Sequence, residues 1–421
     1  MEVASEEIPA LQKIPKDLQL RFYSLIEDEV NKLIKNFETN RELIYGAIRD
    51  EVRRGIRRVE DLPDWSDMKI AFVDGSDTPV IDERIGLNYG LYAVICKLFK
   101  GYDPVEGAEW YLGGKLGDAP SESAAEFKLA LDLVTTYYER YVAVQTLMSY
   151  DPDLIIIDGS FFGYRYLSSG VVRKKFMWVD QQSGEMFKTF GDLLHRITDL
   201  TEELINSGKA VAIVKRVITN SICGYLKYKY GDDFDLRMSD RLLLNLVMDD
   251  NELFDFNKFI ENGVWYGYFS NYGGRVDDRD GSGKSRERAL KEAIRLYENT
   301  IKINLALRDR DQIKRVSGLV TGLERYFLKT TRDQLPVCLE FPRGIDERLL
   351  GSTIRYMFET VNHSTGFPIC FDLIDNLVSL PRGLTREFID EIEARLLSMG
   401  IDKLYLLSVF GKVNPQKEFE G

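Results

Sequence analysis

The chain has 421 residues, of which 44% are hydrophobic and 12% aromatic, and this composition excludes a globally disordered protein. Its net charge of −12 argues against a protein that coats nucleic acid through a broad basic surface, but leaves room for a local basic channel. No run approaches the length of an apolar membrane span, and the acidic N-terminus lacks the apolar core of a signal peptide. We therefore expect a cytoplasmic protein with no membrane contact.

Cysteine and histidine are too sparse for a soft-metal site. The four cysteines are far apart and form no Cys-x-x-Cys pair, which is typical of buried apolar residues in a reducing compartment. Only two histidines are present. Any metal must therefore be held mainly by carboxylates, a ligand set that favours Mg²⁺ or Mn²⁺.

Residues 1–65 are predicted to form an N-terminal helical region. Apolar residues recur at helical spacing between Leu20 and Ile34, and a second, highly charged helix is expected over about 41–58. The sequence DLPD at 61–64 breaks this pattern. We expect the apolar positions between 20 and 34 to be core residues or a dimer contact.

The same short pattern occurs twice further along the chain. Residues 68–76 read MKIAFVDGS, and residues 154–160 read LIIIDGS. Each apolar, β-branched run predicts a buried strand, and the glycine after it lets the chain turn sharply. Asp74 and Asp158 are therefore expected at the C-terminal ends of core strands, where open α/β sheets place ligands. Because neighbouring carboxylates repel each other unless a cation neutralises them, the pair predicts a divalent-metal site.

The other predicted elements make residues 66–421 an α/β domain. In chain order we expect one or two strands over 80–100, a loop over 101–117, a helix from 121 to 148, a helix over 190–206, a strand over 210–215, a partly helical segment over 239–262, an exposed aromatic strand over 264–272, a polar insertion near 271–288, helices over 345–361 and 385–398, and a last strand over 403–409.

The helix between the two repeats carries Glu126 near its start. Aspartate on a first strand, glutamate on a helix and aspartate on a later strand is the acidic arrangement of RNase H-like nucleases. There, two metal ions activate a water and stabilise the leaving oxygen of a phosphodiester. Glu122 is a rival ligand, and a helix-dipole role is the alternative for Glu126. One Asp-Gly-Ser alone would indicate only a turn, but two copies flanking this helix favour the metal site.

Five segments in order resemble the NurA nucleases: FVDGS at 72–76, SAAEFKLALD at 123–132, IIIDGS at 155–160, the strand ending in Lys215, and GFPICFDLIDNL at 366–377. The resemblance spans about residues 68–380. It implies an RNase H-like mixed sheet flanked by helices, with the N-terminal helical region and further insertions added. It also implies a nuclease that depends on Mn²⁺, with Mg²⁺ as the second candidate, and that digests DNA from 5′ ends and cuts single strands internally.

The resemblance further implies partners and site residues. The partners are DNA, both single-stranded and as duplex ends, a second copy of the chain in a homodimer, and a HerA-type hexameric ATPase that translocates DNA during end resection. Carried over by position, the metal ligands are Asp74, Glu126, Asp158 and Asp375, and Lys215 approaches the scissile phosphate as a point charge.

Two of these assignments have alternatives. Many relatives have a histidine where Asp375 stands, and an aspartate binds a metal but does not donate a proton as imidazolium does. Asp372 is the competing ligand if the register is shifted. A solvated lysine at the end of a strand is an equal alternative for Lys215.

Two other functions compete with a metal-dependent nuclease. An actin-like or sugar-kinase-like ATPase would use the Asp-Gly-Ser turns to cradle phosphates, but Phe161 and Phe162 follow the second motif and no glycine-rich adenosine-binding segment is visible. An inactive adaptor that docks a motor ring is disfavoured by the intact acidic set and kept open by Asp375. Phe161, Phe162 and Tyr164 are candidates for stacking on an end base, with packing as the alternative.

Overall fold

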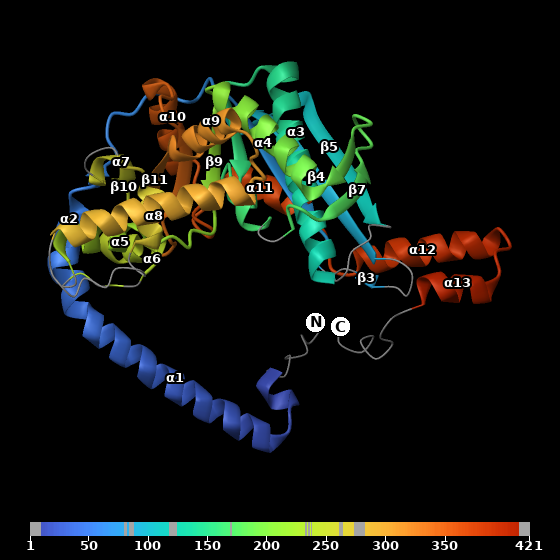
Figure 1. Ribbon diagram of the computed structural model, residues 1–421, viewed down its shortest axis with the longest axis horizontal. Coiled ribbons are helices and arrows are strands. Elements are labelled where there is room, and N and C mark those ends of the chain that lie inside the picture. Colours follow the sequence, from blue (N-terminus) through green and yellow to red (C-terminus); the bar gives the residue numbers. More distant parts are fainter. Residues whose placement is uncertain are drawn as a thin grey trace, which may run out of the picture.

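The computed structural model describes residues 10–411 except 80–81, 84–87, 118–123, 169–170, 232–233, 235, 237, 261–263 and 273–282. In this part of the chain a ten-stranded mixed sheet forms the centre of the molecule, and a separate two-stranded hairpin, β7–β8, lies beside it (Figure 1). The strands are β1 (Ile56–Arg58), β2 (Lys69–Asp77), β3 (Asp82–Glu83), β4 (Asn88–Lys100), β5 (Asp103–Gly117), β6 (Leu154–Asp158), β7 (Lys175–Val179), β8 (Met186–Thr189), β9 (Ala210–Val214), β10 (Glu252–Asp255), β11 (Leu323–Lys329) and β12 (Val337–Pro342).

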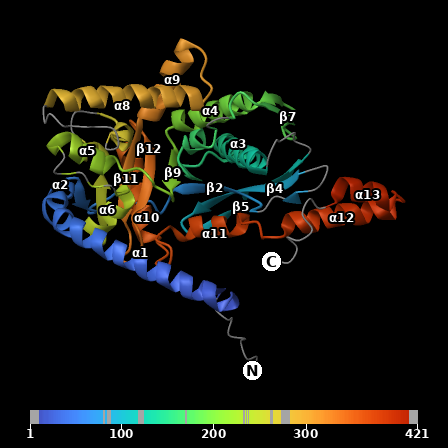
Figure 2. The ribbon, with the colours of Figure 1, turned by 60° about the horizontal axis from the view of Figure 1, so that its bottom comes forward.

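Helices cover both faces of the sheet (Figure 2). They are α1 (Lys16–Leu43), α2 (Arg49–Arg53), α3 (Ala124–Tyr150), α4 (Phe190–Asn206), α5 (Ser221–Tyr230), α6 (Asp240–Val247), α7 (Phe256–Phe259), α8 (Gly283–Asn304), α9 (Arg310–Thr321), α10 (Glu347–Glu359), α11 (Ile369–Val378), α12 (Leu384–Ser398) and α13 (Lys403–Phe410), with the shorter turns η1 (Ala10–Lys13), η2 (Ile44–Ile48), η3 (Gly163–Tyr166) and η6 (Tyr266–Asn271).

The order of the strands confirms the expected fold class. Strands β5, β4 and β2 are antiparallel neighbours, and β6 and β9 continue the sheet parallel to β2, so that the order is β5-β4-β2-β6-β9. This is an RNase H-like sheet. Strands β12, β11, β10 and β1 extend it with antiparallel pairing.

Alternation along the central strands divides the core into two layers. In β2, Ala71 and Val73 pack on the side of α3 and α4, whereas Ile70 and Phe72 pack on the side of α10 and α11. The strands β6 and β9 alternate in the same way. Because successive side chains of a strand point to opposite faces, a polar residue that continues either series faces the corresponding helices.

Several local predictions were wrong. Residues 56–58, expected to be helical, form the edge strand β1. The expected loop over 101–117 is the long strand β5, the aromatic segment 264–272 forms the largely buried turn η6, and 403–409 lies in helix α13. Most of the polar insertion near 271–288 lies outside the described residues, and α8 begins at its end.

Helix α1 projects from the body, and α12 and α13 project as a pair elsewhere on the molecule (Figures 1 and 2). Apolar side chains of α1 are more than two-fifths exposed, which contradicts a core role; they are Leu18, Leu20, Phe22, Tyr23, Leu25, Ile26, Val30, Leu33 and Ile34. No helix among the described residues has the length and apolarity to cross a membrane. All four cysteines are buried, and none of them forms a disulfide.

Candidate metal centre

The register of the parallel strands brings Asp74 and Asp158 together. Val73 of β2 is the partner of Ile157 of β6, so the aspartate that follows each residue lies at the same level of the sheet. Asp74 continues the series of Ile70 and Phe72, and Asp158 continues the corresponding series of β6. Both carboxylates therefore belong to the face of the sheet that α11 covers.

Helix α11 adds a third carboxylate to this face. One oxygen from each of Asp74, Asp158 and Asp375 lies within 4.8 Å of the other two. Asp372, one turn earlier, is outside this group because its carboxylate accepts hydrogen bonds from Asn362 Nδ2 at 2.7 Å and Thr365 Oγ1 at 2.5 Å. The structure thus gathers three of the four ligands expected from the sequence.

Lys215 lies between the carboxylates of two different elements. It follows directly after β9, and its Nζ is 2.9 Å from Asp158 Oδ2 and also donates a hydrogen bond to Asp375 Oδ1. Its ammonium group is 4.7 Å from the centroid of the Phe371 ring. Burial opposes the charge on Lys215, but the two carboxylates outweigh burial and raise its pKa. The lysine is therefore a fixed positive charge inside the site.

Glu126 does not join this group. It lies in the first turn of α3, and Lys174 Nζ donates a hydrogen bond to its Oε2 at 2.7 Å. Glu139, 13 residues further along α3, lines the same groove as Asp74, Asp158 and Asp375. At 1.5 Å per residue the two glutamates are about 20 Å apart along the helix axis.

The lengths of the elements explain why Glu139 is level with the aspartates. Asp158 is four residues beyond the start of β6, which corresponds to a rise of about 13 Å. Glu139 is 11 residues before the end of α3, a rise of about 16 Å in the helix. Because α3 leads into β6 through a short connection, these similar rises place the two side chains at about the same height. This comparison would have identified Glu139 from the sequence.

Gly75 makes the approach of Glu139 possible. It points toward α3, and a Cβ atom at this position would lie 2.7 Å from Glu139 Oε1, 2.8 Å from Glu139 Cγ and 2.9 Å from Thr135 Cγ2. In the second repeat the glycine has a different role: Gly159 has φ +78°, a left-handed conformation that allows the chain to turn after Asp158.

The site is strongly acidic. Burial, followed by the nearby charges of Asp158 and Glu139, raises the pKa of Asp74 well above its ordinary value. Burial also raises the pKa of Glu139 to about 8, against the lowering effect of Arg140. Carboxylates that are buried together in this way favour either protons or a cation.

The donor set fits a hard divalent cation. All the candidate ligands are carboxylate oxygens, which Mg²⁺ and Mn²⁺ accept, and neither histidine lies in the acidic group. Asp74, Asp158 and Asp375 would hold such an ion, and Glu139 is the nearest further acidic residue of the groove. This groove of about 850 Å³ extends from the acidic group between the loops that follow β6 and β9.

The loop after Asp158 is fixed from behind by a buried carboxylate on β12. Glu340 is 1% exposed and accepts hydrogen bonds from Ser160 Oγ at 2.7 Å and from the Phe161 amide at 3.0 Å. Arg325 of β11 neutralises it, with both Nε and Nη2 at 3.0 Å from Glu340 Oε1. Sequence reasoning missed this pair because its members are far from either repeat.

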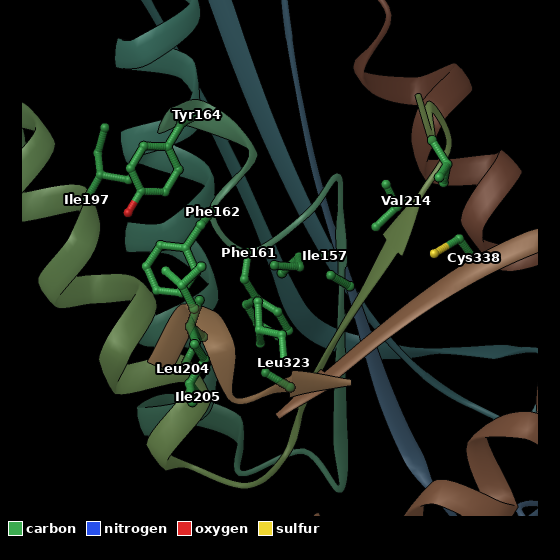
Figure 3. Packing of buried hydrophobic residues seen from close by; sticks show 14 of the residues in the cluster. Ile157, Phe161, Phe162, Tyr164, Ile197, Leu204, Ile205, Val214, Leu323 and Cys338 are labelled. Carbon is green, nitrogen blue, oxygen red and sulfur yellow. The ribbon is translucent and has the colours of Figure 1, made fainter. Parts of the chain in front are cut away.

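The aromatic residues of this loop pack into the core. Phe161, Phe162 and Tyr164 are buried, and Figure 3 shows Tyr164 near Ile197 and Phe162 near Leu204, both of α4, and Phe161 near Leu323. The hypothesis that one of them stacks on a base is therefore wrong, and packing is their role.

Comparison with known proteins gives a likeness in fold. No family model matches the chain, and no curated protein matches it. The crystal structure of the NurA nuclease from Sulfolobus solfataricus aligns with a TM-score of 0.52 at 12% identity, covering 93% of this chain and 99% of that one. Structures of NurA bound to dAMP and manganese and of NurA with manganese each align with a TM-score of 0.41, at 11% and 10% identity. The chain therefore has the fold of the NurA nuclease, as the sequence resemblance implied.

Proposed function

We propose that the chain is a divalent-metal-dependent deoxyribonuclease. The observation that carries the proposal is the convergence of Asp74, Asp158 and Asp375 from β2, β6 and α11, with their oxygens within 4.8 Å of one another. The likeness in fold to a NurA nuclease supports the same function. The cofactor is Mn²⁺, with Mg²⁺ as the second candidate.

Each residue of the site has a separate role in the proposed reaction. When bound, a divalent ion supplies activation of water and neutralisation of the phosphodiester charge. Asp74, Asp158 and Asp375 would hold it, and Glu139 would complete the acidic set from the other side of β2. Lys215 exchanges its carboxylate partners for a phosphate oxygen of the substrate and offsets the charge that develops during cleavage.

The finer activity follows from the resemblance. We propose digestion of DNA from 5′ ends and cleavage within single strands, in the resection of double-strand breaks together with a HerA-type hexameric translocase. Digestion of linear single- and double-stranded DNA that is labelled at either end gives the polarity of digestion. Co-migration of the chain with such an ATPase on size-exclusion chromatography tests the partnership, and separate elution would contradict it.

The assay that tests the function is cleavage of these substrates with Mn²⁺, Mg²⁺ or EDTA by wild type and Asp158→Ala. We expect wild type to degrade DNA when a divalent ion is present. We expect this degradation to be lost in EDTA and in Asp158→Ala. Cleavage that survives both changes contradicts it. Absence of cleavage with either metal would instead favour the inactive adaptor or the ATPase, which nucleotide binding then separates.

A homodimer is part of the proposal. The apolar side chains that α1 leaves more than two-fifths exposed are candidates for an interface, and a second copy would cover them. Light scattering after size-exclusion chromatography is expected to give twice the chain mass for wild type and the chain mass for Leu25→Asp/Leu33→Asp. A monomeric wild type would contradict the dimer.

A further inference from the structure

The groove that holds the acidic group is also lined by aromatic rings and cations. They belong to η3, η6 and α8, and among them are Arg165, Tyr166, Trp265, Tyr266 and Tyr297. This part of the lining differs in chemistry from the acidic group, since it offers π-faces and positive charge.

These groups form one continuous packed chain. The rings of Trp265 and Tyr297 lie edge to face, with centroids 4.9 Å apart. The guanidinium carbon of Arg165 lies 5.5 Å from the Tyr297 centroid and 4.5 Å from the Tyr166 centroid. Arg165 also donates hydrogen bonds to both hydroxyls, and the bond to Tyr166 is 2.7 Å long.

The chain of rings ends on an open face. Trp265, Tyr297 and Arg165 are all buried, whereas Tyr166 is 56% exposed. Because Arg165 lies over one face of the Tyr166 ring, a ligand that stacks on this ring would use the other face. The ring cannot turn away freely, since Arg165 holds both its face and its hydroxyl. Tyr166 is thus a rigid, half-open aromatic surface within the groove of the metal centre.

We propose that the exposed face of Tyr166 is a stacking platform for a nucleobase of the single strand that crosses the metal centre. This rests on the proposed nuclease function and names a substrate subsite within it. Every base has a π-face, so such a platform binds without sequence preference, and the cation behind the ring adds to the attraction. Ile218, 86% exposed on the loop after β9, lines the same groove and adds apolar surface.

The test is the affinity of a fluorescein-labelled oligothymidylate, measured by fluorescence anisotropy in EDTA so that no cleavage occurs. Tyr166→Ala is expected to weaken binding by about 5- to 150-fold, the range that loss of one stacked base gives. Tyr166→Phe keeps the ring and is expected to bind within about twofold of wild type.

The matched control is Tyr111→Ala. Tyr111 is 60% exposed and has Lys97 Nζ 5.6 Å from its ring centroid, but it lies on β5, away from the residues that line the groove. Its removal is expected to leave binding unchanged. Thermal unfolding of Tyr111→Ala is expected to match wild type, whereas Tyr166→Ala and Tyr166→Phe both lose the hydroxyl that accepts a hydrogen bond from buried Arg165 and are expected to unfold at a lower temperature. A loss of binding confined to Tyr166→Ala therefore reports the ring.

A second substrate isolates the base from the backbone. An abasic oligonucleotide of the same length keeps the phosphates, so wild type and Tyr166→Ala are expected to bind it equally, and the salt dependence is expected to be the same for both proteins. Equal binding of oligothymidylate by wild type and Tyr166→Ala would overturn the platform alone. Failure of wild type to bind any oligonucleotide would overturn the proposed DNA-directed function as well.

Discussion

Replacing Gly75 by alanine tests the geometry of the acidic centre at its tightest point. The new Cβ would lie 2.7 and 2.8 Å from Glu139 Oε1 and Cγ and 2.9 Å from Thr135 Cγ2. All three distances are below van der Waals contact, and α3 is packed into the core, so the Glu139 side chain must move. Such overpacking ordinarily costs about 1–3 kcal/mol of the free energy of unfolding.

The matched control is Gly113→Ala on β5, where the nearest atom to a new Cβ is Tyr92 O at 3.7 Å. A substitution without a clash is expected to be neutral or to stabilise by up to about 1 kcal/mol, because alanine restricts the unfolded chain. The difference between the two variants is therefore expected to be about 1–4 kcal/mol in urea unfolding.

Shortening the displaced side chain gives the rescue. Adding Glu139→Ala to Gly75→Ala is expected to recover part of the loss as a coupling free energy of at least about 0.5 kcal/mol, with the Thr135 contact accounting for the remainder. Mn²⁺ binding is expected to be weakened in Gly75→Ala and unchanged in Gly113→Ala. If Gly75→Ala and Gly113→Ala are equally stable and bind Mn²⁺ equally, the Glu139 side chain does not pack against Gly75.

Four other predictions concern single substitutions and the effect of pH. Glu139→Gln is expected to weaken Mn²⁺ binding in calorimetry by about 10- to 100-fold and Glu126→Gln to leave it unchanged; the opposite order would restore the assignment made from sequence. Lys215→Met is expected to slow cleavage about 10²- to 10³-fold, because the charge that develops on the phosphate is no longer offset. It is not expected to weaken Mn²⁺ binding, since it removes a positive charge from the ion's site. Weaker Mn²⁺ binding would contradict the role of Lys215 as a phosphate contact. Arg325→Met leaves Glu340 buried without its partner and is expected to cost about 3–5 kcal/mol in urea unfolding, so a loss below about 1 kcal/mol would show that the pair is dispensable. Because burial raises the pKa of Glu139 to about 8, this carboxyl carries a proton at neutral pH without metal. Binding of Mn²⁺ must displace this proton, so the Mn²⁺ affinity is expected to fall by up to about tenfold per pH unit between pH 8 and 6. An affinity independent of pH would refute the link between proton release and metal binding.

The strands that carry the repeats could be predicted because their apolar, β-branched sequence indicates both a β conformation and burial. The run LIII at 154–157 is apolar at every position, as expected of a strand covered on both faces. Parallel pairing of two such strands then places Asp74 beside Asp158 without further information. This part of the site followed from local pattern and elementary sheet geometry.

Other elements could not be assigned from local pattern. Strand β5 alternates between exposed and partly buried positions and contains glycine and proline, so its pairing with β4 decides its conformation. The short apolar run 403–409 suits either a helix or a strand. It is a helix because the Asp402 side chain accepts hydrogen bonds from the amides of Leu404 and Tyr405 at its start.

Side chains that meet through long-range packing were the hardest to foresee. Glu126 and Glu139 are on the same helix, and only the position of α3 along β6 decides which of them is level with the aspartates. The role of Tyr166 depends on Arg165 and Tyr297, which lie 132 residues apart in the chain. No local pattern encodes such a contact.

Calorimetric titration of Mn²⁺ into wild type and Asp158→Asn tests the acidic centre most directly, because it needs no assumption about the substrate. Asp158 offers one of the three clustered carboxylate oxygens, and asparagine keeps the size of the side chain, so the comparison isolates the charge. We expect saturable binding to wild type that is weakened at least about tenfold in Asp158→Asn. Identical isotherms for the two proteins, or no binding to wild type, would contradict a metal centre at this site.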